Sequence, residues 1–357
     1  MSDSLSPSIT VDAVVIGAGQ AGLAAAYYLQ QHQQRFVILD ERTAVGDVWA
    51  ARFDTLKLFS PAWVSGLPGY AWSGNPLRYP SKEDAAAYLR QYAAHFHFPL
   101  ALGQRVVRVA PAAHQPGYEV HTAAGQRYQA RHVIVCTGAY NAPCLPEFAP
   151  QLDSSVLQLH SSAYRRASLL AGQGPVAVVG SGNSALQIAA DLASTGRPVY
   201  AAYKERTPHL PNNTAMWVFL RSTGLLKASR HSHIGQRLFE RPEPVVSSDL
   251  ARLRRFPNVH FIGKALAVEA GTQLRGRHAL TPPLEAVVWA TGYGPAFDWI
   301  DVPVFDAAGE PQHHRGLTAA PGIAFLGLPW LNTRSSALMG GVGADAQYVV
   351  DTLLKST

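Results

Sequence analysis

Two glycine clusters in this chain have the spacing of backbone loops that bind pyrophosphate. The first, Gly17-Ala-Gly19-Gln-Ala-Gly22, follows an apolar run at residues 11–16 and precedes a helical pattern at residues 23–30. In such a loop the first glycine permits a tight turn, the second lets the backbone approach the pyrophosphate, and the third lets helix and strand pack closely. The amino end of the helix then faces the anion. This order of strand, turn and helix predicts a dinucleotide site.

The second cluster, Gly180-Ser-Gly182-Asn-Ser-Ala185, repeats the arrangement in the middle of the chain. It follows the apolar residues 176–179 and precedes a helix expected over residues 186–192. Alanine in the third place still permits close packing of the helix on the strand. Two copies of one motif in a single chain therefore predict two dinucleotide sites.

The two sites differ at the end of the strand that follows each helix. Asp40 ends the first such strand, where it suits a ribose hydroxyl and would repel a 2′-phosphate, so the first site is expected to bind FAD. Lys204 and Arg206 stand in nearly the same place after the second cluster and would attract a 2′-phosphate, which favours NADPH. Glu205 between them could accept bonds from the ribose of NADH, so we expect a preference short of absolute. An ordinary solvated strand end is the alternative for this basic pair.

These elements predict an α/β fold with two Rossmann-type dinucleotide-binding domains, the NADPH domain being inserted into the FAD domain. We expect residues 1–153 and 282–357 to form the FAD-binding domain and residues 154–281 the NAD(P)H-binding domain. The polar and basic stretch at about 208–255 is interpreted as a lid-like insertion. A strand over residues 284–290 is expected to return the chain to the first domain.

Composition excludes several classes of protein. The chain of 357 residues is 47% hydrophobic, which allows a large core, and its two cysteines cannot build a disulfide framework. The net charge of +6 suits anionic dinucleotides, and a dense basic face with stacking aromatics for nucleic acid is missing. No apolar run approaches the about 18 residues that span a membrane. We therefore interpret the chain as cytoplasmic, without stable membrane association; its oligomeric state stays open, a homodimer included.

Histidine pairs do not predict a metal site. Each pair lacks a recognisable third ligand, so no metal is expected. The pairs are His95-Phe-His97, His231-Ser-His233 and His313-His314.

Together with the residues between them, the two clusters resemble the class B flavoprotein monooxygenases, which include flavin-containing and Baeyer-Villiger monooxygenases. Gly46-Asp-Val-Trp49 is similar to the family's GGxW turn, with Asp47 replacing the second glycine. Cys136-Thr-Gly138 and the prolines that follow resemble its ATG segment, and Trp289-Ala-Thr-Gly-Tyr293 matches its ATGY element. The FxGxxxHxxxF/Y motif falls on residues 154–164, where His160 and Tyr164 match and Ser154 and Val156 replace the aromatic residue and the glycine.

The resemblance implies the chemistry. Enzymes of this family reduce FAD with NADPH, capture O2 as a C4a-peroxyflavin, and insert one oxygen atom into a sulfide, an amine or a ketone. It implies a flavin-dependent monooxygenase whose partners are O2 and a small organic substrate, with sulfoxidation or Baeyer-Villiger oxidation as outcomes. Such chemistry belongs mainly to the cofactor, so no catalytic triad or carboxylate pair is needed.

Two non-oxygenase classes are the alternatives. A flavin reductase or oxidase would use NAD(P)H to pass electrons to oxygen or a partner, and a disulfide reductase would also need a close cysteine pair. Cys136 and Cys144, eight residues apart, do not supply one. An FAD-bound sensor would not need the second, basic site.

The candidate catalytic residues are few. Many flavin-containing monooxygenases have an Asn beside the flavin in the segment that corresponds to residues 56–61, and this chain has none there. Phe59 or Ser60 is expected in its place, so leakage of hydrogen peroxide is expected, and His160 is a candidate for a hinge or nicotinamide-side role. The turn from Gly340 to Asp345 resembles the family's closing flavin contact, where a helix amino end would stabilise negative charge on reduced flavin.

The residues expected at the cofactors share a place in one of these motifs or strand ends. They are Gly17, Gly19, Gln20, Ala21, Gly22, Asp40, Glu41, Arg42, Trp49, Thr137, Gly138, Gly180, Gly182, Asn183, Ser184, Lys204, Arg206, Thr291, Gly292, Tyr293, Gly341 and Asp345.

Overall fold

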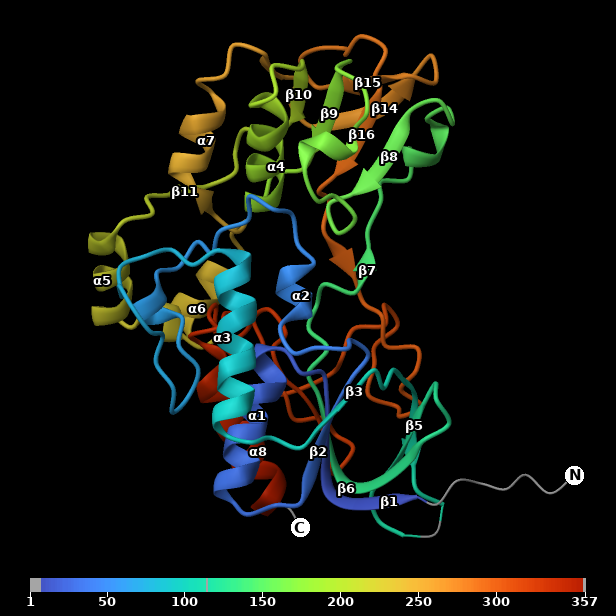
Figure 1. Cartoon of the computed structure of the whole chain (residues 1–357), viewed down its shortest axis with the longest axis vertical. Helices are drawn as coiled ribbons and strands as arrows, with labels where there is room; N and C mark the ends of the chain where they lie inside the picture. Colours follow the sequence, from blue (N-terminus) through green and yellow to red (C-terminus); the bar gives the residue numbers. More distant parts are fainter. Residues whose placement is uncertain (1–7, 114, 356–357) are drawn as a thin grey trace, which may run out of the picture.

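The computed structural model describes residues 8–113 and 115–355, which form two α/β lobes (Figure 1). The first and last described residues lie in the lower lobe, and the upper lobe is built from the middle part of the chain. Each lobe has its own mainly parallel sheet. The predicted α/β fold with two Rossmann-type domains is therefore confirmed.

The lower lobe is organised around a sheet with the strand order β3-β2-β1-β6-β5-β4. The amino-terminal half of β6 pairs with β5, whereas its carboxyl-terminal half pairs with β18. The centre of this sheet is fully buried, as expected of parallel strands covered on both faces. The strands are β1 (Ile9–Ile16), β2 (Phe36–Asp40), β3 (Leu100–Leu102), β4 (Val106–Pro111), β5 (Tyr118–Thr122), β6 (Arg127–Val135) and β18 (Ile323–Phe325).

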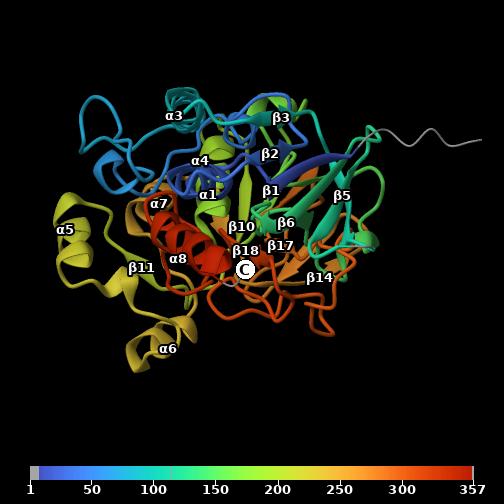
Figure 2. The ribbon, with the colours of Figure 1, turned by 90° about the horizontal axis from the view of Figure 1, so that it is seen from below.

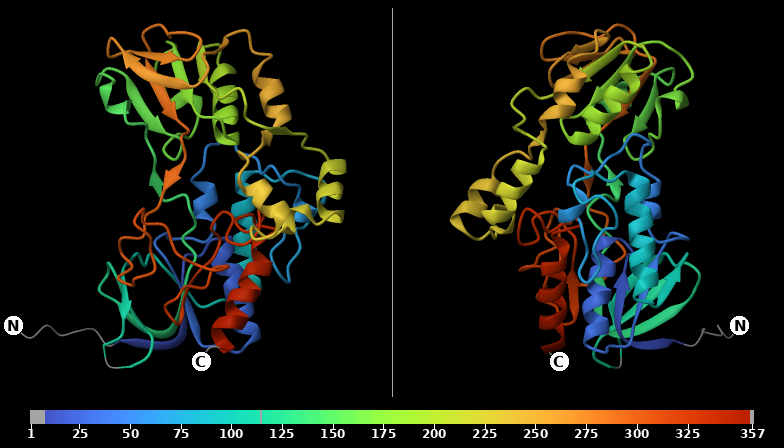
Figure 3. Two further views of the ribbon diagram at one scale, coloured as in Figure 1. Left: turned by 180° about the vertical axis from the view of Figure 1, so that it is seen from behind. Right: turned by 60° about the vertical axis from the view of Figure 1, so that its left-hand side comes forward.

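Three long helices accompany this sheet: α1 (Gln20–Gln31), α3 (Lys82–His95) and α8 (Val342–Lys355). A short helix, α2 (Asp47–Ala50), follows β2. α1 and α8 lie side by side, although they come from opposite ends of the chain (Figures 1 and 3). His32 and Asp351 join them by a contact of 2.7 Å between Nε2 and Oδ1. The carboxyl-terminal helix is therefore part of the first dinucleotide fold.

The upper lobe contains a parallel sheet with the order β13-β10-β9-β16-β8. α4 (Asn183–Ala193) and α7 (Ser247–Leu253) accompany it, and a hairpin of β14 (Ala265–Glu269) and β15 (Gln273–Gly276) precedes its last strand. The strands of the sheet are β8 (Leu157–His160), β9 (Val176–Val179), β10 (Val199–Ala202), β13 (Val259–Phe261) and β16 (Ala286–Trp289).

The position of β16 corrects one expectation. The strand predicted over residues 284–290 exists, but it pairs with β9 and β8 in the upper sheet and does not return to the first domain. Its four residues are all buried, so the apolar sequence could not tell which sheet buries them. The return crossing lies after β16, beyond the boundary expected at residue 282.

Both crossings between the lobes run through one small antiparallel pair, β7 (Ala142–Pro143) and β17 (Tyr293–Gly294). The Cys144 amide also donates to the carbonyl oxygen of Gly292 at 3.0 Å. The chain therefore leaves and re-enters the lower lobe at neighbouring points.

A separate arm joins β10 to α7. It contains β11 (His209–Leu210), α5 (Thr214–Ser222), α6 (His233–Phe239) and β12 (Val245–Val246). The arm lies to the side of both lobes, which is clearest from below and from behind (Figures 2 and 3). Its Arg230 amide donates to the carbonyl oxygen of Asn332 at 2.6 Å, and Ser335 Oγ donates to that of Leu226 at 3.0 Å. The arm thus contacts the lower lobe.

Candidate functional site

The first glycine cluster forms the turn between β1 and α1. Gly17 has a φ of +110°, and a Cβ there would lie 2.7 Å from the carbonyl oxygen of Cys136. A Cβ on Gly22 would overlap the carbonyl oxygen of Gly17, whereas a Cβ on Gly19 would meet nothing within 4 Å. Protein atoms close the space at the first and third glycines. Only the second faces open space, which is what a loop that admits pyrophosphate requires.

The amino end of α1 carries no side-chain cap. Its N-cap residue is Gly19, so the first backbone N–H groups of the helix have no side-chain acceptor. α3 in the same lobe differs, because Ser81 and Asp84 form a complete capping box there. Uncapped N–H groups that face open space form an anion site.

Asp40 lies beside this loop at the end of β2. Its Oδ2 accepts the Ala18 amide at 2.6 Å, and its Oδ1 accepts the Arg42 amide at 2.8 Å. Each carboxylate oxygen keeps a further lone pair. The side chain is thus held in place and can still accept a ribose hydroxyl.

A cavity of about 590 Å³ extends from this loop toward the upper lobe. Thr137 Oγ1 at this cavity is buried and has no hydrogen-bond partner among the described residues. The open glycine, the uncapped helix and this unpartnered hydroxyl fit a bound dinucleotide. Of the residues expected at the cofactors, those that line the cavity are Gly17, Gly19, Asp40, Glu41, Arg42, Thr137 and Tyr293.

The other residues expected here lie close by. Trp49 Nε1 donates to Gln20 Oε1 at 3.3 Å, and Gln20 Nε2 donates to the carbonyl oxygen of Ala337 at 3.2 Å. Ala21 is buried in α1. Gly138 lies in the next turn, and a Cβ there would meet nothing within 4 Å.

The second cluster repeats the geometry of the first in the upper lobe. Gly180 has a φ of +154°, and a Cβ there would overlap the carbonyl oxygen of Ala290. Gly182 faces open space and is the N-cap of α4, again without a side-chain cap. Asn183 Oδ1 accepts the Val246 amide at 2.9 Å, and Ser184 is exposed. The amino end of α4 therefore has the geometry that could bind an anion.

Residues 204–206, which follow β10, are exposed. Each of them has different contacts. The Lys204 amide donates to Ser181 Oγ at 2.8 Å, which fixes the strand end to the glycine loop. Glu205 Oε1 is in contact with His278 Nε2. Lys204 and Arg206 make no ion pair within the described part of the chain. The carboxylate that could serve NADH is thus engaged, and the two basic side chains remain available to a phosphate.

Four side chains meet where the lobes join. Arg52 Nη1 donates to the Tyr293 hydroxyl at 2.9 Å, and its guanidinium lies 5.7 Å from the ring centre of Tyr140. His160 packs edge-on against Tyr293 with ring centres 4.8 Å apart. Arg52 and Tyr140 also line the first cavity. Sequence reasoning missed both; the only signal for Arg52 was its place three residues after Trp49.

His160 connects β8 to the segment that crosses between the lobes. Its Nε2 donates to the carbonyl oxygen of Gly292 at 3.0 Å, and its Nδ1 lies 2.9 Å from Ser162 Oγ. Burial lowers the pKa of His160 below its usual range, although the Gly292 carbonyl acts in the opposite direction. His160 thus bridges β8 and the 291–293 turn.

Phe59, Ser60, Gly341 and Asp345 do not line the first cavity. Ser60, Gly341 and Asp345 line a second one, and the Phe59 ring stacks on that of Trp217 in the arm with centres 6.4 Å apart. A Cβ on Gly341 would overlap the carbonyl oxygen of Ser335. This glycine is therefore required by packing within the protein.

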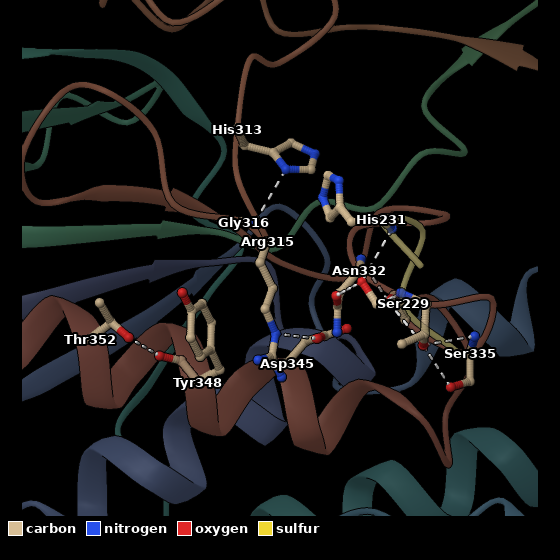
Figure 4. Close-up of polar contacts among 12 residues, drawn as sticks. Ser229, His231, His313, Arg315, Gly316, Asn332, Ser335, Asp345, Tyr348 and Thr352 are labelled. Atoms are coloured by element: carbon tan, nitrogen blue, oxygen red, sulfur yellow. Dashed lines mark hydrogen bonds and ion pairs between the residues drawn. The ribbon is translucent and has the colours of Figure 1, made fainter. Parts of the chain in front are cut away.

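Asp345 is buried at the start of α8, with an exposed fraction of 2%. Its Oδ1 lies 3.5 Å from Arg315 Nε, and the Arg315 guanidinium lies 4.0 Å from the ring centre of Tyr348 (Figure 4). Arg315 thus offsets the charge of this carboxylate beside the second cavity.

Other chemistry finds little support in the described residues. Both cysteines are free, and burial raises the pKa of the Cys136 thiol well above its usual range. Between residues 8 and 355, leaving out 114, no group of three or more His, Cys, Asp or Glu side chains could hold a metal ion. In the same part of the chain no helix is both long and apolar enough to span a membrane.

Comparisons of the sequence with known proteins identify the family and a relative of similar length. A family model described as pyridine nucleotide-disulphide oxidoreductase matches residues 14–226. An uncharacterized oxidoreductase CzcO-like of Geobacillus kaustophilus is 38% identical over 356 residues, which cover 96% of this chain and 98% of that protein.

Two solved structures of monooxygenases are similar to this chain along nearly its whole length. The flavin-containing monooxygenase of Stenotrophomonas maltophilia superposes with a TM-score of 0.78 at 27% identity, covering 98% of this chain and 99% of that one. A cyclohexanone monooxygenase of Rhodococcus bound to NADP⁺ has a TM-score of 0.69 at 17% identity, covering 98% and 85%, and this likeness concerns the fold alone. The resemblance to class B flavoprotein monooxygenases is thereby confirmed, and the expected FAD and NADPH agree with it.

Proposed function

The chain belongs to the pyridine nucleotide-disulphide oxidoreductase family, and we propose that it is a flavin-dependent monooxygenase within it. In this proposal FAD occupies the lower lobe and NADPH the upper lobe, and one atom of O2 is transferred to a small nucleophilic molecule, a sulfide or an amine. Oxygenation of a ketone is the alternative outcome. The similarity over nearly full length to a flavin-containing monooxygenase supports this class.

The observation that carries the proposal is the matched pair of open glycines. Gly19 and Gly182 each cap a helix without a side-chain acceptor, and each faces open space. Gly138 and Gly292, at the crossing between the lobes, are open in the same way. Two dinucleotides bound at the helix ends would extend toward this crossing, where a nicotinamide could reach a flavin.

The residues of the chain would bind and orient the two groups. The amino ends of α1 and α4 would hold the pyrophosphates, Asp40 a ribose, and Lys204 and Arg206 the 2′-phosphate. Bound FAD supplies the transfer of electrons from NADPH to oxygen. Arg52, fixed by Tyr293, adds positive charge at the end of the first cavity that faces the crossing.

Reduction of a disulfide is the weaker alternative despite the family's name. It needs an accessible thiolate pair, whereas Cys136 is buried with a raised pKa and Cys144 is exposed in the connecting segment. An NAD(P)H oxidase or flavin reductase remains the competing assignment. It shares both cofactors and differs only in the fate of oxygen.

The segment at residues 56–61 is relevant to the choice between a monooxygenase and an NAD(P)H oxidase. It carries no amide side chain, and Ser60 Oγ is engaged with Ser65 Oγ at 2.8 Å. Phe59 is partly exposed and contacts the arm. We therefore expect oxygenation to be accompanied by release of hydrogen peroxide.

The test begins with the purified protein, which should be yellow with non-covalent FAD. Under air, NADPH consumption and hydrogen peroxide are measured with an aryl sulfide, an amine and a cyclic ketone, and products are identified by mass spectrometry. An oxygenated product that takes its oxygen from labelled O2 supports the proposal. If all three substrates return only hydrogen peroxide, the chain is an NAD(P)H oxidase or reductase.

We also propose the division of the chain between the two cofactors. The FAD-binding part would run to β7 and resume at β17, and the NAD(P)H-binding part would lie between them. The pairing of β7 with β17 supports this division.

A further inference from the structure

A second cavity of about 1060 Å³ lies apart from the two dinucleotide loops. Its walls come from three segments that are distant in the sequence: residues 60–76, the arm at residues 217–227, and the chain between Arg315 and Asp345. None of these segments contributes to the first cavity. The second cavity is therefore separate from the one that adjoins the first glycine loop.

Flat aromatic side chains form much of the wall, and their neighbours fix them. The Trp72 ring stacks on Tyr88 with centres 4.2 Å apart and planes 4° apart, and its Nε1 donates to the Ser65 carbonyl at 2.8 Å. Trp217 is 7% exposed, and its Nε1 donates to Asn212 Oδ1 at 2.8 Å. Rigid aromatic walls favour a flat apolar ligand, because little side-chain entropy is lost when it binds.

Two cations of the arm face the same cavity. Arg221 and Lys227 line it and are exposed, and in the described part of the chain no carboxylate lies within 4.0 Å of either. The Arg221 guanidinium lies 5.3 Å from the ring centre of Trp63, so the aromatic face holds it while its edge keeps N–H donors. These donors suit the two oxygens of a carboxylate.

The acidic lining residue does not cancel this charge. Asp345 is the only Asp or Glu that lines the cavity among the described residues, and it is paired with Arg315, which also lines the cavity (Figure 4). Arg221 and Lys227 therefore leave an unbalanced positive charge on the arm side. A neutral or cationic ligand would leave it unmatched.

The cavity also lies next to the proposed flavin site. Ser60 belongs to the segment that follows the GGxW-like turn, and it lines the second cavity. Trp49 of that turn is connected through Gln20 to Ala337, in the segment whose Ser335 and Leu338 line the same cavity. A ligand here would lie beside the elements that hold the first dinucleotide.

We propose that this cavity binds the organic substrate, and that the substrate is a carboxylate with a flat apolar body. The body lies between the tryptophans, and the carboxylate meets Arg221 and Lys227. This inference rests on the proposed function, because it names the substrate class for that oxygenation. It assigns to the arm the recognition of the substrate's charge.

The experiment uses one acid and its ester as probes. The holoenzyme is given para-(methylthio)benzoate or its methyl ester, and sulfoxide formation is followed by chromatography. Binding of each probe to the oxidised holoenzyme is measured separately by calorimetry, without NADPH. We expect the acid to be preferred about tenfold over the ester, in both affinity and kcat/KM, which is the lower range for a charge-assisted hydrogen bond.

The variants are Arg221→Gln and Lys227→Gln, which keep most of each side chain's length. Each should reduce the acid-to-ester ratio to about threefold, and the double variant to about one, as expected when two contacts share the effect. Arg221→Lys should restore part of the ratio. Arg237→Gln is the matched control, because Arg237 is an exposed arginine of the same arm that does not line the cavity.

The outcomes separate this inference from the proposed function. If the acid binds preferentially and the preference depends on Arg221 but no sulfoxide forms, the binding site stands and the oxygenase assignment fails. If both probes are oxygenated equally, or if Arg237→Gln lowers the ratio as much as Arg221→Gln, the substrate class proposed here is wrong.

Discussion

The two glycine loops of this chain have the same local geometry and different surroundings. Gly19 and Gly182 are both open and cap helices without side-chain acceptors. In the lower lobe the strand-end side chain turns back, and Asp40 accepts the Ala18 amide of the loop. In the upper lobe the direction is reversed, because Ser181 of the loop accepts the amide of Lys204 and leaves that side chain in solvent.

This difference fits the two kinds of ligand that we propose for the loops. The lower loop opens into a walled cavity, which suits a cofactor that stays bound through many turnovers. The upper loop carries exposed basic side chains at its strand end, which suits a coenzyme that binds and leaves in each cycle. Under the proposed assignment, the same backbone motif would serve retention of FAD in the lower lobe and exchange of NADPH in the upper lobe.

The largest effect is expected from Gly19→Leu. The backbone at Gly19 has a φ of −78°, which leucine adopts without strain, and its side chain would fill the open space of the loop. The protein should fold and lose its FAD completely. Flavin absorbance against protein concentration, with circular dichroism as the folding control, checks this; full FAD content in the variant would contradict the assignment of the lower loop.

Gly182→Leu is the matched change in the upper lobe. Its backbone φ of −90° is equally permissive, and the added side chain would enter the second open space. We expect FAD to be retained while the KM for NADPH rises at least about a hundredfold, through loss of several pyrophosphate contacts. Stopped-flow reduction of the bound flavin measures this. A variant that lost FAD instead would reverse the two assignments.

Arg206→Ala tests the strand end with a smaller effect. A charged contact to the 2′-phosphate contributes about 1.5 to 3 kcal/mol, so the preference for NADPH over NADH in kcat/KM should be about ten- to a hundredfold and should largely disappear. Turnover with NADH should change little. Equal or better kcat/KM with NADH in the unmodified protein would show that Lys204 and Arg206 point elsewhere.

The smallest effect concerns the lower lobe at acidic pH. Burial lowers the pKa of His313 from its usual 6.5 to about 4, and its Nδ1 accepts the Gly316 amide at 3.2 Å (Figure 4). Between these two values the unfolded chain binds a proton that the folded chain does not, so stability falls as pH decreases from 6.5 toward 4.

His313→Asn should remove this contribution and keep an acceptor near Gly316. On going from pH 7 to pH 5, the free energy of unfolding should fall by about 1 kcal/mol less in the variant than in the unmodified protein. The difference is small because the side chain is partly exposed. Urea unfolding at the two pH values measures the difference. An unchanged pH dependence would show that His313 is protonated without cost in the folded state.

The sequence predicted those parts of the fold that depend only on residues close together in the chain. The spacing of the glycines, the strands before them and the acidic or basic strand ends follow from the backbone, and the sequence displays them directly. The assignment of β16 failed because four buried apolar residues fit the centre of either sheet. The pairing partner of a strand is decided by contacts across more than a hundred residues, which no local pattern records.

The candidate site was predictable to a similar extent. Gly17, Asp40 and Tyr293 were expected and line the first cavity. Arg52 was not expected, because its role depends on Tyr293 lying beside it after the chain has passed through the whole upper lobe. The second cavity was also beyond prediction, since its three walls meet only when the arm folds back onto the lower lobe.

The pairing of β7 with β17 has a consequence for how the upper lobe could be exchanged between related proteins. Residues Pro143 and Tyr293 are direct neighbours in that pair, so the upper lobe begins and ends at almost one point. A short turn between these strands would close the lower lobe as an uninterrupted nucleotide-binding unit. Under the proposed division of the chain, the upper lobe could be exchanged as a unit, which would change coenzyme preference and leave the flavin-binding lobe continuous.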